Sequence, residues 1–153
     1  MQEFYRNLLA GKPKAVAASS TTAGLQKWIF DSSSGQWNLA YVLQSGLQLG
    51  VPYTVANYPM GNNPATGLPW SPGTDGLRNI TGITNGDGTV TIYAITSTVS
   101  GNGDQGADPN RLVVITDQLS ATTLPNESFT TFQSAGNLEV LRGVSFTPGT
   151  SMR

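Results

Sequence analysis

Six carboxylates are the side chains of this sequence that could carry acid–base chemistry. They are Asp31, Asp75, Asp87, Asp117, Glu127 and Glu139. A glycoside hydrolase needs two carboxyl groups flanking the scissile bond, but no spacing in the sequence pairs any two of these six. Asp31, Asp87 and Asp117 fall at expected strand ends or turns, where Asp is favoured for structural reasons. Carboxylate-dependent glycoside hydrolysis is therefore the third of three functional hypotheses.

The residues that most catalytic sites use are missing. The chain contains no His and no Cys, which removes the usual general base, the usual nitrogen ligand for metals, and the thiolate nucleophile. No Gly-x-Ser-x-Gly motif is present, and the Gly-x-Gly-x-x-Gly string at residues 101–106 does not open a helix, as a dinucleotide site requires. We expect a protein that is not an enzyme.

A calcium ion is the one cofactor that the sequence suggests. Residues 101–110 alternate oxygen-bearing side chains with glycines, and hard cations prefer oxygen ligands on flexible backbone. Asp104 and Asp108 are the candidate metal ligands. The segment lacks the spacing and the final Glu of an EF-hand loop, so a solvated loop of Asx turns is the alternative. Otherwise we expect no cofactor.

Loop aromatics form the candidate ligand site. Tyr53, Tyr58 and Trp70 lie with Met60 in the Pro- and Gly-rich segment 45–75. Loops of this length are usually functional or mobile, and exposed aromatic faces with little nearby charge suit a neutral carbohydrate. A lectin-like module is the second functional hypothesis. The aromatics expected in strands are more often core residues; they are Trp28, Trp37 and Tyr41.

Two glycosylation sequons occur, at Asn79 and Asn126. Only Asn126 falls in an expected loop, so it is the candidate acceptor if the protein is secreted. The first ten residues include Glu3 and Arg6 and lack an apolar segment typical of a secretory signal. The sequence itself assigns no compartment.

The composition is typical of one all-β domain. Charged residues make up only 11% of 153, and the formal net charge is −1, which argues against nucleic-acid partners. No apolar run is long enough for a membrane span. Apolar residues are spread through the chain, so one packed core is expected.

Strand patterns account for most of the chain. Residues 76–97 predict a hairpin around Asn85-Gly86-Asp87-Gly88, and residues 24–43 predict a second one. Further strands are expected at 111–117, 128–132 and 138–147, with a weaker one at 49–55. Residues 2–9 favour a short helix and 14–22 a short strand. The domains expected are an N-terminal extension (1–23), the strand region (24–150) with its long loop at 45–75, and a tail (151–153).

A weak internal repeat indicates how the expected strands are arranged. LRNIT at 77–81 is echoed by LRGVS at 141–145, and WIFD at 28–31 by VITD at 114–117. The chain here resembles the C-terminal blades of extracellular β-propeller repeat proteins. The segments that carry the resemblance are residues 24–28, 37–43, 77–81, 88–94, 110–117 and 142–148. It implies about two four-stranded antiparallel blades and an extracellular location; a small β-sandwich is the alternative fold.

Two blades cannot close a ring and would leave an edge and an apolar face exposed. We therefore expect partners: further copies of the chain in a head-to-tail homo-oligomer, with residues 138–147 completing a neighbour's blade, or other blades of a larger protein. The first functional hypothesis is accordingly a noncatalytic interaction or structural module. A neutral glycan is the ligand expected under the second.

Overall fold

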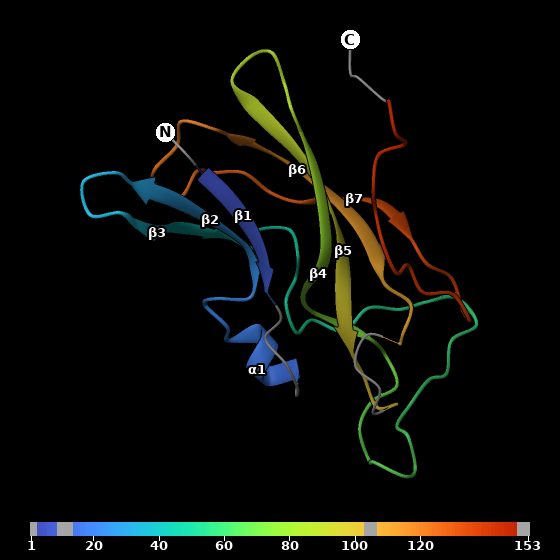
Figure 1. Ribbon diagram of the computed structural model, residues 1–153. Helices are drawn as coiled ribbons and strands as arrows, with labels where there is room; N and C mark the ends of the chain where they lie inside the picture. The colour runs from blue at the N-terminus through green and yellow to red at the C-terminus, as the bar shows by residue number, and fades with distance from the viewer. Residues whose placement is uncertain (1–2, 9–13, 103–106, 150–153) are drawn as a thin grey trace.

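The chain folds into two antiparallel β-sheets and one short helix (Figure 1). The computed structural model describes residues 3–8, 14–102 and 107–149. One sheet has the order β1-β2-β3 and the other β4-β5-β6-β7, so the all-β prediction is confirmed. The elements are β1 (Glu3–Leu8), α1 (Lys14–Ala18), β2 (Gly24–Asp31), β3 (Gln36–Leu43), β4 (Gly73–Thr84), β5 (Thr89–Val99), β6 (Arg111–Gln118) and β7 (Thr130–Ser134).

Both predicted hairpins are confirmed. In the β2–β3 turn, the Asp31 carboxylate accepts hydrogen bonds from Ser33 and Ser34, and these lower the pKa of Asp31 to about 2. In the β4–β5 turn, Asp87 accepts hydrogen bonds from Thr89, and Gly88 adopts the positive φ that this turn requires. Short-range turn chemistry therefore fixes both hairpins.

The N-terminal predictions were wrong in both type and order. Residues Glu3–Leu8 form a strand, not a helix, because they pair with residues 24–29 of β2; a helix this short gains too few hydrogen bonds to compete. The helix lies instead at Lys14–Ala18, where the prediction was a strand. Its sequence, KAVAA, is rich in the best helix former.

Three further strand predictions need correction. Residues 49–55 form only isolated bridges, Leu49 to Thr74 and Pro52 to Gly73. Residues 138–147 form no strand; instead the Leu141 backbone bonds the side chain of Asn110. The strand expected at 128–132 lies at Thr130–Ser134.

The core lies where the two sheets meet, with β1 and β2 against β4. Its main members are Leu25, Tyr41, Leu43, Leu47, Leu77, Val90, Ile92, Ala94, Val113, Ile115 and Phe129. Register explains the set, because Ile92 pairs with Ile115 and Ala94 with Val113 on one face of the larger sheet. None of the helices in the described residues could cross a membrane.

Candidate functional site

A cluster of titratable side chains lies between the two sheets around a buried ion pair. We call it the closed site and define it as Lys27, Asp117, Tyr5, Tyr41 and Glu127. Lys27 Nζ lies 3.2 Å from Asp117 Oδ2, and neither side chain is exposed. The Tyr41 hydroxyl donates to Asp117 at 2.7 and 2.8 Å from its two oxygens. The Tyr5 hydroxyl donates to Asp117 Oδ2 as well.

Register on each sheet brings these groups together. Lys27 pairs with Tyr5 on β1 and with Tyr41 on β3, so the three side chains stand in a row on one face. Asp117 follows Val113 and Ile115 at two-residue spacing on β6, so its side chain lies on the same buried face of the strand as theirs. This face is turned toward Lys27 and the two tyrosines. Asp117 is the penultimate residue of β6, close to the strand end where it was predicted, and its side chain is buried.

Lys27 is held as firmly as its partner. Its ammonium group donates to the backbone oxygens of Gln118 at 2.6 Å and Leu119 at 3.0 Å. It also lies 5.3 Å from the Tyr41 ring centroid and 5.8 Å from that of Tyr5, a range in which cation–π attraction operates. The cluster thus offsets the cost of burying a charge with several specific contacts.

Glu127 borders the closed site from the loop after β6. Burial raises its pKa from an ordinary 4.5 to about 7, and the negative charge of Asp117 and a hydrogen bond to it act in the same direction. Glu127 Oε2 is buried and has no hydrogen-bond partner within the described part of the chain. The structure thus brings together two carboxylates that the sequence left unpaired.

A second aspartate site lies at the other end of β6; we call it the open site and define it as Asp108, Asn102, Tyr58, Tyr53 and Lys14. Tyr58 and Asn102 both donate to Asp108 Oδ1. Asp108 is 1% exposed, yet its Oδ2 has no hydrogen-bond partner among the described residues. Partial burial lowers the pKa of Lys14, and the charge of Asp108 opposes that shift.

Two pockets flank the open site. One, of about 220 Å³, is lined by Tyr53, Tyr58, Pro59 and Met60, among others. The other, of about 290 Å³, includes Arg111, whose guanidinium lies 3.9 Å from the Tyr53 ring centroid. Burial raises the pKa of both tyrosine hydroxyls, so they stay protonated and act as hydrogen-bond donors.

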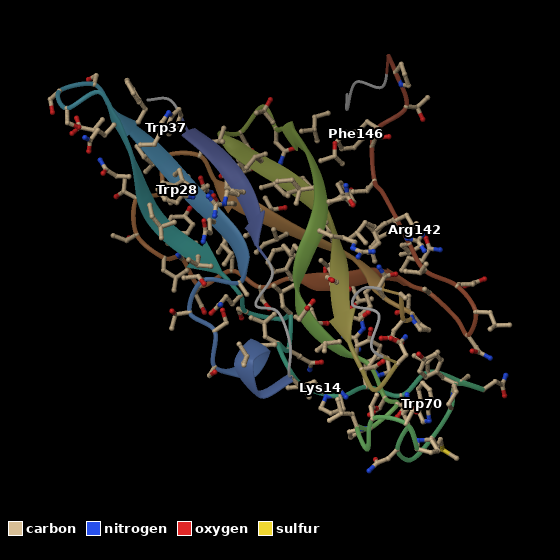
Figure 2. All side chains as sticks on the ribbon, turned by 60° about the horizontal axis from the view of Figure 1, so that its bottom comes forward. Lys14, Trp28, Trp37, Trp70, Arg142 and Phe146 are labelled. Carbon is tan, nitrogen blue, oxygen red and sulfur yellow. The ribbon has the colours of Figure 1, made fainter. Side chains whose placement is uncertain are left out.

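The structure joins two predicted sites that the sequence kept apart. Tyr53 and Tyr58, candidates for a ligand, lie next to Asp108, a candidate for a metal. Trp70 is half-buried in the same loop region (Figure 2) but lines neither pocket.

The remaining site predictions stay predictions. Asp104 lies outside the described residues. Asn126 is exposed, as a glycosylation acceptor must be. No group of three or more carboxylates in the described ranges could hold a metal ion. Comparison of the chain with family models, curated proteins and solved structures gives no match.

Sequence reasoning missed the closed site. A signal was available: Lys27 shares its strand face with Leu25, and Asp117 shares its face with Ile115. A charged residue on an otherwise apolar face predicts a buried charge, which needs a partner of opposite sign.

Proposed function

We propose that the protein is a noncatalytic interaction or structural module of β-propeller type, whose sheets stack on those of further copies of the chain. The observation that carries the proposal is an apolar patch on the β2–β3 hairpin: Trp28, Phe30, Trp37 and Leu39. Trp37 is 39% exposed and Leu39 43%. Contiguous apolar surface of this kind marks an interaction site.

A register shift between β2 and β3 places these residues on one outer face. The pairing of β2 with β3 shifts between Lys27 and Trp28, so Lys27 and Tyr41 face the core while the next pair, Trp28 and Leu39, faces away from it. Phe30 and Trp37 follow on the same outer face, with their ring centroids 5.4 Å apart.

The larger sheet offers a second apolar surface. Tyr93 on β5 stacks edge-on against Phe132 and Phe146, with centroids 5.9 and 5.8 Å apart. Phe132 is 66% exposed. Figure 2 shows Phe146 on the opposite side of the view from Trp28 and Trp37. A patch at one side that fits a surface at the other generates head-to-tail assembly.

The blade interpretation draws support from the topology. The sheet β4-β5-β6-β7 is a four-stranded antiparallel meander whose neighbours are consecutive in sequence, the plan of one propeller blade. The three-stranded sheet corresponds to an incomplete blade. Such a unit gains most by stacking on another copy, because neither sheet can close on itself.

Light scattering coupled to size-exclusion chromatography tests the proposal. We expect the wild type to form oligomers whose mass rises with concentration, and Trp37→Lys to shift it to a monomer. Asn38→Lys is the matched control, since Asn38 is exposed on the same strand but pairs with Ile29 on the other face. A wild-type monomer at every concentration contradicts the proposal.

A neutral carbohydrate ligand is the second candidate, favoured by the 220 Å³ pocket beside Tyr53 and Tyr58. Aromatic faces and a hydroxyl donor suit a sugar ring. A glycan array with the wild type, Tyr58→Ala and Trp70→Ala tests it. We expect binding to be lost in Tyr58→Ala and retained in Trp70→Ala; no binding by the wild type removes this candidate. Hydrolysis ranks third, because the paired carboxylate Asp117 has no exposed surface.

A further inference from the structure

We propose that Lys27 and Asp117 form an intramolecular isopeptide bond between the two sheets. Lys27 Nζ and Asp117 Oδ2 lie 3.2 Å apart without any solvent exposure. An amine and a carboxyl group in lasting contact, away from water, are the two reactants of amide formation. The product would join β2 of one sheet to β6 of the other.

Preorganisation supplies much of the driving force. The backbone oxygens of Gln118 and Leu119 hold Nζ against Asp117, and the neighbouring strands hold both side chains in place. Groups fixed in this way react with effective molarities of about 10⁵–10⁸ M. Exclusion of bulk water from the contact also favours the amide over its hydrolysis.

The reaction balances without any further reactant. A proton moves from the Lys27 ammonium to the Asp117 carboxylate across their 3.2 Å contact. The neutral amine then attacks Asp117 Cγ, forming the C–N bond and a tetrahedral carbon. Nitrogen gives up one proton, which passes to the hydroxyl on that carbon, and this hydroxyl leaves as water. Nothing is oxidised or reduced.

The neighbouring side chains have roles in this step. The hydroxyls of Tyr41 and Tyr5 donate to the Asp117 oxygens, so they stabilise the negative charge that develops on oxygen during the attack. Glu127 lies beside Asp117 and is the group placed to carry a proton from nitrogen to the departing hydroxyl. Its pKa of about 7 gives it both protonation states near neutral pH.

Released water has a way out. Glu127 lines a surface pocket of about 290 Å³ together with Leu43, Pro125 and Asn126, among others. The carboxyl of Glu127 therefore lies between the buried reacting pair and solvent. Departure of water through this pocket would leave the core residues in place.

Intact mass spectrometry of the denatured wild-type chain is the test. We expect a mass one water below that of the sequence, and a protease digest in which the peptides containing Lys27 and Asp117 are joined. Glu127→Gln should slow the appearance of this species at least tenfold. Asp117→Asn should lose ammonia in place of water, because its leaving group is an amide nitrogen.

Two controls separate the bond from other losses of water. Lys27→Arg keeps the positive charge but is not nucleophilic, so it should retain its full mass. A loss of water mapped to Asp87-Gly88 would be a succinimide and would overturn the proposal. So would a folded wild type that keeps its full mass after prolonged incubation, with the two peptides separate.

Discussion

Two buried aspartates at opposite ends of β6 share one kind of hydrogen-bond donor, a tyrosine hydroxyl, and differ in their other partners. Asp117 and Asp108 each accept a hydrogen bond from a tyrosine hydroxyl. Asp117 also has a lysine at 3.2 Å and a second tyrosine. Asp108 has an asparagine, and its Oδ2 meets no donor within the described residues.

The difference teaches what each end can do. A carboxylate whose acceptor positions are filled by the protein has no capacity left for a ligand. It can fix one sheet against the other. A carboxylate with an unused oxygen beside two pockets retains capacity for a donor group or a cation, at a cost in stability. The closed site is therefore suited to holding the two sheets together, and the open site is suited to binding a ligand.

Loss of the lysine should give the largest effect. Lys27→Met removes the proposed link between the sheets and leaves Asp117 buried without its cation, and we expect the free energy of unfolding to fall by at least about 3–5 kcal/mol, the cost of breaking a buried ion pair. Asp108→Asn at the open site should cost only about 1–2 kcal/mol, since the amide keeps an acceptor for Tyr58. Urea titration followed by circular dichroism measures both. Equal losses would show that the two sites do not differ as described.

Two glycines allow the packing of the loops next to the two sites to be compared. Gly46 and Gly61 both have positive φ, at +84° and +72°. A Cβ at Gly46 would lie 2.2 Å from the backbone oxygen of Phe129, in the loop that carries Glu127, whereas a Cβ at Gly61 meets nothing. We expect Gly46→Ala to cost about 3 kcal/mol and Gly61→Ala about 1 kcal/mol. Thermal unfolding of the pair gives the difference; similar melting temperatures would contradict tight packing beneath the closed site.

The tyrosines offer a comparison of single hydroxyl groups. Tyr41→Phe removes a donor from a charge that keeps two other partners, Tyr5 and Lys27. Tyr58→Phe removes one of the two donors to Asp108. We expect Tyr41→Phe to cost about 2–3 kcal/mol, because its hydroxyl is fully buried against a charge, and Tyr58→Phe about 1 kcal/mol. Denaturant midpoints measure these losses, and a reversed order would show that Asp108 depends more on its tyrosine than Asp117 does.

Local patterns predicted the parts of the fold that are local. Both hairpins followed from alternation and turn residues, because their hydrogen bonds form between neighbours in sequence. Residues Glu3–Leu8 could not be placed in this way, since their partner is β2 and the pairing is set by tertiary contact. The same limit hid the closed site, whose ion pair joins Lys27 to Asp117 across two sheets.

The open site was predicted in pieces. Tyr53 and Tyr58 were chosen as loop aromatics and Asp108 as an oxygen ligand, each for its own reason. The sequence could not show that the hydroxyl of Tyr58 would reach Asp108, because residues 59–107 separate them. Which loops meet depends on the path of the long segment 45–75 over the sheet, and no local pattern encodes that path.

The smallest predicted effect is a pH dependence at the closed site. Burial is the largest cause of the raised pKa of Glu127, from 4.5 to about 7, and it persists whether or not Lys27 and Asp117 are joined. Between these two values the folded chain binds more protons than the unfolded chain, so stability falls as pH rises from 4.5 to 7. Allowing for solvent screening of a partly exposed group, we expect a fall of about 1 kcal/mol.

Glu127→Gln is the variant that decides this prediction, because its amide does not titrate. Asp31 works in the opposite sense, since its lowered pKa gives stability that is lost only as pH falls below about 4. The two groups therefore act in separate pH ranges. Urea unfolding from pH 4.5 to 8 should show a decline in the wild type and a smaller one in Glu127→Gln. Identical slopes in the two proteins would mean that Glu127 is not protonated in the folded state, and the closed site would lose its proton carrier.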